Sequence, residues 1–446
     1  MYTHIFIDYI MIARDRYLSE LIKVRNNGSA KIITGIRRCG KFYLLNVIYR
    51  NYLIESGVPE NNIIQIDLTL ISNAYYRDPI YLYEHVLDLT KQNKGISYVI
   101  LDEIQEVYSL VNLALTDGKH IKAKSTDEDI ITFVDVILDL ASRPNIDLYV
   151  TGSNSKMLSS DIVTEFRDKA TNIRLMPLSF EEFYAYKKED ESKAVSEYLT
   201  YGGMPSTVLS DDENKSDYLK ELFETTYLRD IVERNKIRKV EALDEVSILL
   251  ASCVGDFINS NKIATLYEAK TNHKIDSETI NSYINAFLDS FIISEAFRYD
   301  LKGKKIINST KKYYYVDLGL RNARLNFVYS DTGKMLENLV YNELLYNGYK
   351  VNVGTFDTFS KDSDNKTVRK SLEVDFLATK GNRMYYLQVC DDFQSEETRK
   401  REIKPYIALN DQITKVIVVN KPIKECRDEH GYTIVGLTDF LLRYIK

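Results

Sequence analysis

The chain has 446 residues, of which 44% are hydrophobic and 28% charged, and its formal net charge at pH 7 is −6. Because single hydrophobic cores stop growing at about 250–300 residues, this length predicts more than one domain. The negative net charge gives no overall attraction to nucleic acid or to anionic membranes, so any such contact requires a local basic surface.

Neither the N-terminal segment nor the cysteines indicate export. No stretch approaches the roughly 20 apolar residues of a membrane span. The apolar segment 1–12 is interrupted by Asp8 and lacks the basic start of a signal peptide. The four cysteines, at 39, 253, 390 and 426, form no close pair and match no zinc spacing. We therefore expect a cytoplasmic protein with reduced thiols and no membrane partner.

The first informative segment is the loop GIRRCGKF at 35–42. The apolar run 30–34 before it predicts a buried strand, and 42–48 follows with helical spacing. Two glycines let successive backbone amides face a phosphate, and Lys41 adds a point charge at the positive end of the helix. The loop therefore fits the nucleotide-binding pattern G-x-x-x-x-G-K-[ST] except at its last position.

At that last position Phe42 stands where a hydroxyl would hold Mg²⁺. The loop therefore predicts binding of ATP, with placement of Mg²⁺ and hydrolysis impaired. The residues expected to surround the nucleotide are Gly35, Arg37, Arg38, Cys39, Gly40, Lys41 and Phe42.

Two further strand ends carry polar side chains. The apolar run 97–101 ends in Asp102 and Glu103, and the run 146–151 leads to Asn154. Open parallel sheets place ligands at the carboxyl ends of their strands. Asp102 is expected to bind the Mg²⁺ shell, Glu103 to polarise water, and Asn154 to hold the attacking water or the γ-phosphate. Taken singly, an acidic pair is also a common solvated turn and Asn154 a helix cap.

Together with these motifs, further segments resemble a prokaryotic family of AAA+-type ATP-binding proteins. The segments are 177–183 (PLSFEEF), 198–205 (YLTYGGMP), 227–234 (YLRDIVER), 336–338 (LEN), 373–376 (EVDF) and 388–389 (QV). The resemblance covers nearly the whole chain. It implies an N-terminal ATPase fused to a C-terminal module of unknown function.

The departures from this family pattern concern catalysis. The family has Ser or Thr where Phe42 stands, and Gly-Arg-Gly where this chain has Asp-Lys-Ala at 168–170. By resemblance, an arginine in this stretch acts on a neighbour's nucleotide, which implies a homo-oligomer or a protein partner. Arg167 remains for that role, whereas Lys169 lacks the planar fork that suits a transition-state phosphate. Both departures predict weak hydrolysis.

The patterns divide the chain into 1–205, an ATP-binding domain, 206–316, a helical linker with a winged helix, and 317–446, an α/β domain. Residues 16–187 alternate strand and helix patterns, which predicts a parallel sheet covered on both faces. Residues 112–130 are polar and are typical of an exposed insertion.

The middle domain shows three helices followed by a hairpin, the order of a winged helix. The helices are predicted at 243–253, 261–269 and 277–290, and the hairpin turns at 302–305. The segment 293–315 contains six basic and two acidic residues, which is an excess of four positive charges. Lys302, Lys304 and Lys305 are the candidate DNA contacts. A solvated face or a protein-binding surface remains an alternative.

The last domain has the order α-β-β-β-α-β and resembles restriction-endonuclease-like folds. The resemblance implies metal ligands on the helix and on a middle strand, and an E-x-K on the next strand. Glu337 and Asp375 match the first two positions, with Glu373 nearby, but the third is 388–390, Gln-Val-Cys. Because one carboxylate and the lysine are missing, Gln388 predicts a degenerate nuclease fold kept for binding.

These expectations combine into an α/β protein with an AAA+-type P-loop parallel sheet, a winged helix and a restriction-endonuclease-like domain. ATP occupancy would rearrange the first domain against the other two. Two alternatives stay open: an ATP-regulated metal-dependent nuclease, and a nucleotide-gated interaction module that does not hydrolyse ATP.

Overall fold

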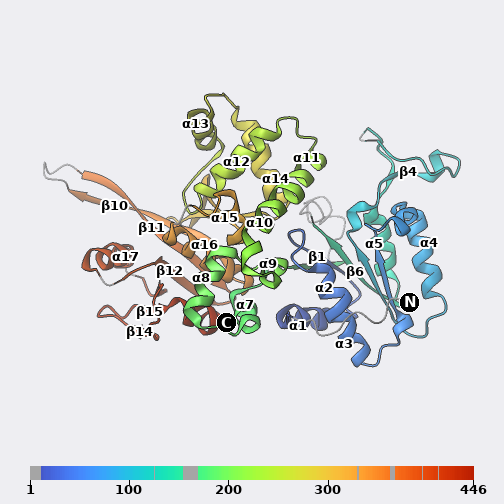
Figure 1. Cartoon of the computed structure of the whole chain (residues 1–446), viewed down its shortest axis with the longest axis horizontal. Coiled ribbons are helices and arrows are strands. Elements are labelled where there is room, and N and C mark those ends of the chain that lie inside the picture. The colour runs from blue at the N-terminus through green and yellow to red at the C-terminus, as the bar shows by residue number, and fades with distance from the viewer. Residues whose placement is uncertain are drawn as a thin grey trace. The chain divides into compact units, whose positions relative to one another are not determined.

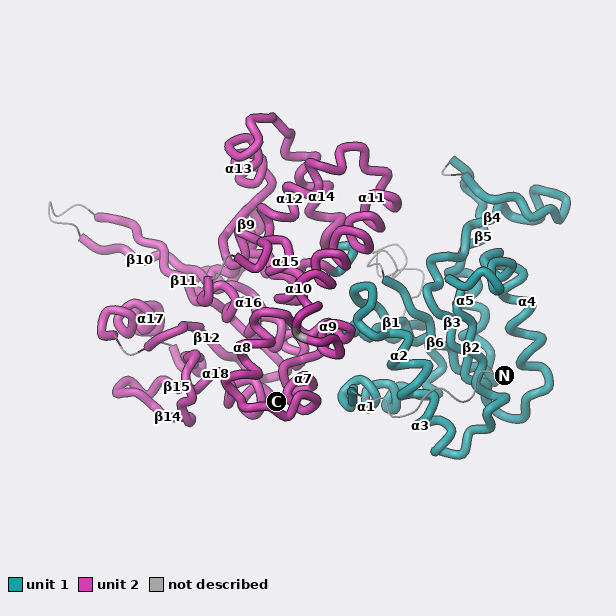
Figure 2. Tube along the Cα trace, in the orientation of Figure 1, with its two compact units in different colours: residues 1–176, 289–291 teal, residues 177–288, 292–446 magenta. Residues whose placement is uncertain are grey.

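The computed structural model describes residues 12–124, 126–153, 169–328, 331–361, 367–393, 395–409 and 411–446. It contains two compact units (Figure 2). Unit 1 comprises Met1–Met176 and Asp289–Phe291, and unit 2 comprises Pro177–Leu288 and Ile292–Lys446. Each unit is described by itself below.

Unit 1 is built on a five-stranded sheet, two strands of which, β1 and β6, are labelled in Figure 1. The strand order is β2-β3-β6-β1-β7, and every neighbouring pair is parallel. The strands are β1 (Ala30–Thr34), β2 (Ile63–Asp67), β3 (Ser97–Asp102), β6 (Ile146–Gly152) and β7 (Ala170–Arg174). All residues of β1, β3 and β6 are buried, as in a parallel sheet covered on both faces. The prediction of such a sheet is confirmed.

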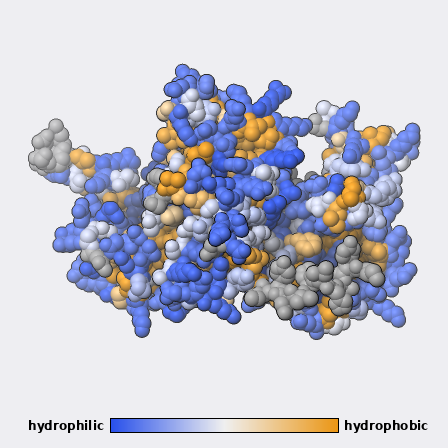
Figure 3. Space-filling model, viewed as in Figure 1, coloured by the Kyte–Doolittle hydropathy of each residue, from blue (hydrophilic) through white to orange (hydrophobic). Residues whose placement is uncertain are grey.

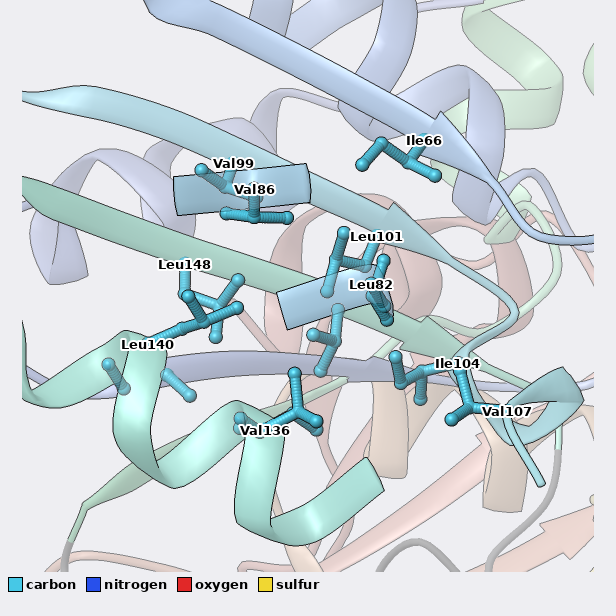
Figure 4. Close-up of a cluster of buried hydrophobic side chains, with 14 of the residues drawn as sticks. Ile66, Leu82, Val86, Val99, Leu101, Ile104, Val107, Val136, Leu140 and Leu148 are labelled. Carbon is cyan, nitrogen blue, oxygen red and sulfur yellow. The ribbon is translucent and has the colours of Figure 1, made fainter. Parts of the chain in front are cut away.

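Helices pack on both faces of this sheet. The helices are α1 (Asp15–Val24), a continuous helix formed by α2 (Lys41–Tyr43), a π-helical turn (Leu44–Tyr49) and α3 (Arg50–Glu55), then α4 (Pro79–Thr90) and α5 (Phe133–Ser142). Leu82 and Val86 of α4 and Leu140 of α5 join the apolar cluster on one face (Figure 4). On the other face the Tyr49 hydroxyl lies 2.5 Å from that of Tyr149.

Between β3 and α5 the chain leaves the sheet, as predicted for the exposed insertion at 112–130. The short strands β4 (Leu110–Val111) and β5 (Ile130–Ile131) pair antiparallel at its base. Most of the described residues between them are exposed or half-buried. The segment between β4 and β5 therefore contributes little to the core, whereas Ile104 and Val107, which precede β4, belong to it.

Unit 2 begins with a helical region. Its helices are α7 (Phe180–Lys187), α8 (Glu191–Tyr201), α9 (Pro205–Leu209), α10 (Asp212–Glu221), which continues through a π-helical stretch (Leu222–Leu228) into α11 (Arg229–Asn235), then α12 (Val240–Ser252), α13 (Ser260–Thr271) and α14 (Ser277–Asp289). The last three lie close to their predicted bounds. Later come α15 (Leu318–Arg324), α16 (Thr332–Tyr346), α17 (Glu396–Leu409) and α18 (Leu437–Asp439) with a final turn (Phe440–Tyr444).

A mixed eight-stranded sheet in the order β14-β15-β13-β12-β11-β10-β8-β9 forms the centre of unit 2. Its strands are β8 (Ile293–Asp300), β9 (Lys305–Tyr315), β10 (Lys350–Lys361), β11 (Thr367–Lys380), β12 (Arg383–Cys390), β13 (Thr414–Val419), β14 (Cys426–Arg427) and β15 (Thr433–Gly436). The β8–β9 hairpin pairs with β10 through Arg298–Val353 and its neighbours. The hairpin and the C-terminal strands therefore share one sheet, which the sequence pattern did not indicate.

The predicted hairpin turn is stabilised by Asp300. Its Oδ1 accepts the backbone N–H groups of Lys302 at 3.1 Å and Gly303 at 2.9 Å. A Cβ at Gly303 would lie 2.3 Å from the same carboxylate, so a larger residue here would displace the Asp300 side chain. Figure 3 shows a predominantly hydrophilic face, and no helix in the described ranges is both long and apolar enough to cross a membrane.

Candidate functional site

The loop between β1 and α2 has the curled backbone that its glycines predict. A Cβ at Gly35 would lie 2.1 Å from the carbonyl oxygen of Leu175, so only glycine allows this approach. Gly40 precedes the helix with φ of 100°, and Arg38 has φ of 64°. Arg37 and Arg38 are exposed. The loop is therefore a compact turn held against the strand end at Leu175, with two guanidinium groups outside it.

Lys41 occupies the centre of this loop. Its side chain is only 4% exposed. Its Nζ donates to the carbonyl oxygens of Gly35 at 3.1 Å and Ile36 at 3.4 Å, and lies 3.6 Å from Oε1 of Glu103. An ammonium held by two neutral carbonyls and one longer ionic contact can exchange these contacts for a phosphate.

The side chains of Cys39 and Phe42, near Lys41 in the loop, differ in their surroundings: one is buried and the other is exposed. The Cys39 thiol is buried and lies 3.6 Å from the Leu175 oxygen, and burial raises the pKa of that thiol. Phe42 is 51% exposed, so its ring belongs to no core. Cys39 therefore shapes the loop, whereas Phe42 occupies the surface at the start of the helix without offering an oxygen.

The carboxyl ends of β3 and β6 are joined by a threonine that the sequence analysis did not single out. The Thr151 hydroxyl donates to Oδ1 of Asp102 at 2.5 Å and accepts the N–H of Glu103 at 2.9 Å. Burial raises the pKa of Asp102 to about 6, with Glu103 and Asp67 adding to the effect and Thr151 and Lys41 opposing it. This carboxyl therefore holds a proton to a higher pH than an ordinary aspartate does.

Glu103 behaves in the opposite way. Burial raises its pKa, but the Lys41 ammonium and hydrogen bonds from Gln105 and Ser153 outweigh burial and lower the pKa overall. Gln105 Nε2 donates to Oε2 of Glu103 and lies 3.4 Å from the Ser153 hydroxyl. The site thus contains one carboxylate that stays ionised beside one that takes up a proton more readily.

A further side chain missed by the sequence analysis is Thr34, at the end of β1. Its hydroxyl is buried and has no hydrogen-bond partner within the described residues. It directly precedes the loop, so a buried polar atom at this strand end is available to a ligand or to water. The predicted residues Asn154 and Arg167 lie outside the described residues.

The donor set fits a nucleotide phosphate better than a metal. Lys41 and the curled loop supply cationic and amide groups, but Phe42 supplies no ligand. Asp102, the predicted Mg²⁺ ligand, lies at the carboxyl end of β3. In the described part of the chain, no group of three or more His, Cys, Asp or Glu side chains could hold a metal ion.

In unit 2 the structure brings Asp375 and Gln388 together. The Asp375 N–H donates to Oε1 of Gln388 at 2.8 Å, and the Val389 N–H donates to Oδ2 of Asp375 at 2.8 Å. Gln388 Nε2 donates to Glu402 at 2.8 Å. Both functional groups of the Gln388 amide are therefore engaged in holding the strands and α17 together.

Glu337, the third predicted residue here, contacts a lysine that the sequence analysis assigned to the basic hairpin. Lys312 Nζ lies 2.9 Å from Glu337 Oε1 and 2.5 Å from Glu373 Oε1. Lys311 likewise pairs with Glu295 at 2.8 Å. The positive charge excess counted along the hairpin is therefore partly neutralised, and the exposed cations at its turn are Lys302, Lys304 and Lys305.

Comparison with known families assigns the class of unit 1. Residues 27–184 match a family described as an AAA domain, and residues 192–331 match a domain of unknown function. The chain therefore carries an AAA domain of the P-loop ATPase type, a class that binds nucleotides.

Two relatives match this chain over nearly its whole length. An uncharacterized protein of Haemophilus influenzae is 29% identical over 442 residues, covering 97% of this chain and 99% of its own. An uncharacterized protein of Methanocaldococcus jannaschii is 29% identical over 472 residues, covering 100% of this chain and 96% of its own.

Among solved structures, Cdc6p of Pyrobaculum aerophilum is 13% identical with a TM-score of 0.27, covering 74% of this chain and 97% of its own. The Aeropyrum pernix ORC1 protein in complex with DNA is 12% identical with a TM-score of 0.29, covering 72% of this chain and 94% of its own. Sequence identities and TM-scores this low support no conclusion about the function of this chain.

Proposed function

We propose that this protein is an ATP-binding AAA protein in which hydrolysis is impaired, and that its nucleotide state controls unit 2. The observation that carries the proposal is the state of Lys41: a buried ammonium inside a glycine-curled loop, held by two carbonyl oxygens at 3.1 and 3.4 Å. A triphosphate would replace those neutral partners with charged oxygens, which bind an ammonium more strongly.

The carboxylates of Asp102 and Glu103 bear on whether the bound ATP is hydrolysed. Glu103, with its lowered pKa, is the group that orients or polarises a water molecule. Thr151 fixes Asp102 in place through its hydroxyl. Mg²⁺, when bound, would neutralise phosphate charge, and Asp102 is the side chain that would hold it. Because Phe42 offers no second oxygen, binding survives and turnover is slow.

Two predicted roles remain part of the proposal. Asn154 would hold the γ-phosphate or the attacking water, and Arg167 would act on the nucleotide of a neighbouring copy or a protein partner. This arrangement makes hydrolysis depend on association, because an arginine supplied from outside stabilises transition-state charge.

Unit 2 would receive the nucleotide signal. We retain the division into 1–205, 206–316 and 317–446, with a winged helix in the middle and a nuclease-like α/β domain at the end. The exposed Lys302, Lys304 and Lys305 at the hairpin turn support contact with DNA phosphates, because phosphate affinity depends on clustered cations.

The alternative, an ATP-regulated metal-dependent nuclease, has less support. Gln388 is engaged by Asp375 and Glu402, and Lys312 lies against Glu337. We expect no cleavage of duplex or branched DNA with Mg²⁺ or Mn²⁺. Cleavage that disappears in Asp375→Ala would reverse this assignment.

Calorimetric titration with ATP tests the main proposal. The expected result is binding both with and without Mg²⁺, together with little phosphate release under saturating ATP. The same titration with Lys23→Ala, an exposed lysine on α1, provides a matched control that retains affinity. Absence of ATP binding to the wild-type protein would overturn the proposal.

A further inference from the structure

In unit 2 the strands β10 and β11 extend beyond the eight-stranded sheet as a ribbon of two strands (Figure 1). Their neighbours end early, because β8 pairs with β10 only at 353–355 and β12 pairs with β11 only at 376–380. Beyond these positions, 356–361 pair with 367–372 and, within the described residues, with no further strand. An isolated pair of strands is marginally stable in water, so a partner along this β10–β11 ribbon would stabilise it.

One face of the ribbon continues from the side on which α17 packs. Phe356 at the base of this face belongs to the apolar cluster that contains Ile403 and Tyr406 of α17. Residues directly opposite each other in antiparallel strands share a face. The face therefore consists of the cross-strand pairs Phe356–Leu372, Thr358–Lys370 and Ser360–Val368.

Three ammonium groups from three different elements reach this face. Lys370 lies on β11 itself. Lys302, from the turn between β8 and β9, has its Nζ 3.4 Å from the carbonyl oxygen of Asp357 and 5.0 Å from the centre of the Phe356 ring. Lys404 comes from α17, and contact with the Lys370 side chain, followed by repulsion between the two charges, lowers the pKa of Lys404. All three lysines are exposed.

The carboxylates of these elements are engaged elsewhere. Asp357 pairs with Arg369 on the opposite face of the ribbon. On α17, Glu396 pairs with Lys400 at 2.6 Å and Glu402 pairs with Arg401 at 2.9 Å. Among the described residues, no carboxylate forms an ion pair with any of the three ammonium groups. Like charges held together repel each other, and a shared anion would replace this repulsion by attraction.

We propose that Lys302, Lys370 and Lys404 bind backbone phosphates of duplex DNA, which then runs along the α17 side of the β10–β11 ribbon. The inference rests on the proposed DNA contact at the β8–β9 turn and extends it to Lys370 and Lys404. Exposed cations spread over three elements suit the repeated phosphates of a polymer better than one enclosed anion. A ribbon of two strands also has the width that the major groove admits.

The first test measures the affinity of the full chain for labelled duplex DNA by fluorescence anisotropy. The double variant Lys370→Gln with Lys404→Gln should bind about tenfold more weakly. Its slope of log affinity against log salt should be flatter by roughly 2, because each phosphate contact adds about 0.9 to this slope. Lys380→Gln with Lys421→Gln is the matched control: it removes the same charge from two exposed lysines outside this face and should retain the affinity.

A second test uses the wild-type protein and therefore does not depend on the folding of a variant. Acetic anhydride acetylates neutral amines, and mass spectrometry locates the modified lysines. Without DNA, Lys404 should be modified faster than Lys421, because its pKa is lowered. Saturating duplex DNA should slow the modification of Lys370 and Lys404 severalfold and leave that of Lys380 unchanged.

A third variant, Lys304→Gln with Lys305→Gln, separates this inference from the DNA contact on which it rests. Weaker DNA binding in this variant, together with normal binding in the Lys370 and Lys404 variant and no protection of these two lysines, would overturn the inference and leave the turn as the DNA contact. The opposite result would support the inference and exclude the turn.

Two results with the wild-type protein would also overturn the inference. One is the absence of duplex DNA binding at low salt, which would remove the DNA contact at the turn as well. The other is calorimetric binding of inorganic phosphate that Lys370→Gln abolishes while the affinity for DNA stays unchanged, because the three lysines would then hold a small anion.

Discussion

Two lysines, one in each unit, are buried to the same extent and serve different purposes. Lys41 and Lys312 are each 4% exposed, and each contacts a glutamate. Lys41 has its shortest contacts, at 3.1 and 3.4 Å, with carbonyl oxygens of its own loop and stands 3.6 Å from Glu103. Lys312 has contacts of 2.9 and 2.5 Å with carboxylates from two other elements.

The difference shows that burial and charge alone do not identify a ligand-binding lysine. An ammonium with neutral partners gains when an anion arrives, whereas one already held between carboxylates would give up ionic partners. The partners therefore decide the role: Lys41 is poised to bind an anion, and Lys312 satisfies anions that the chain itself supplies.

The largest expected effect tests whether Lys41, unlike Lys312, contributes to ATP binding. Lys41→Ala should lower ATP affinity by roughly 100-fold, because hydrogen bonds to charged groups are worth about 1.5–3 kcal/mol each. Lys312→Met should leave ATP affinity unchanged. Calorimetric titration of both variants measures the effect, and an equal loss in the two would show that the lysines do not differ in role.

Exposed lysines provide a third case, in which the side chain faces solvent instead of a buried partner. Replacing Lys302, Lys304 and Lys305 by Glu should weaken DNA binding about tenfold or more at every sequence alike. The slope of log affinity against log salt should become flatter by roughly 2–3, because each phosphate that the protein neutralises adds about 0.9 to this slope.

Charge reversal of three other exposed lysines, Lys400, Lys421 and Lys424, is the control for the total charge change. Binding of DNA measured by fluorescence anisotropy from low to high salt distinguishes the two sets. An unchanged slope in the hairpin variant would indicate that a protein partner, not DNA, occupies this surface.

The sequence predicted the parallel sheet and the loop at Lys41 because both depend on local signals. Strand periodicity and the fixed spacing of Gly35, Gly40 and Lys41 are recognisable without any tertiary contact. Lys312 and Thr151 were missed because their roles depend on partners far along the chain: Glu337 is 25 residues from Lys312, and Asp102 is 49 residues from Thr151.

The pairing of β8 with β10 could not be predicted for the same reason. The sequence of the hairpin is typical of an independent wing because its turn chemistry at Asp300 and Gly303 is local. Its continuation into the C-terminal sheet depends on a parallel pairing between strands separated by α15 and α16. Long-range pairing of this kind leaves no spacing in the sequence.

A smaller effect sharpens the comparison beside Lys41. Phe42→Ser should raise ATP turnover roughly tenfold, since an added hydroxyl can position Mg²⁺ while the loop and Lys41 are unchanged. Phe42→Ala removes the ring without adding an oxygen and should leave turnover low. Phosphate release under saturating ATP measures the difference.

The two variants also separate a second possibility at Phe42. If the ring blocks the nucleotide, the wild type binds no ATP and both Phe42→Ser and Phe42→Ala gain binding. Turnover of the wild type equal to that of Phe42→Ser would show that this position does not limit hydrolysis.

The smallest effect concerns Asp102, whose pKa lies at about 6 in the folded chain against an ordinary value of 3.8. An acid with a raised pKa binds its proton more tightly when folded than when unfolded. Folding stability therefore falls as pH rises from about 4 to about 6. The Asp102→Asn variant lacks this pH-dependent loss. The difference between its free energy of unfolding and that of the wild type should therefore be about 1 kcal/mol more favourable to the variant at pH 7 than at pH 5.

Urea denaturation of the nucleotide-free proteins at the two pH values measures this difference. The Lys41 ammonium lowers the pKa of Asp102. When Asp102→Asn is made in a Lys41→Ala background, the stability that it gains should therefore continue to rise at higher pH than in the wild-type background. A stability difference that is equal at pH 5 and pH 7 would contradict the raised pKa. A gain with the same pH range in both backgrounds would show that the Lys41 ammonium does not act on Asp102.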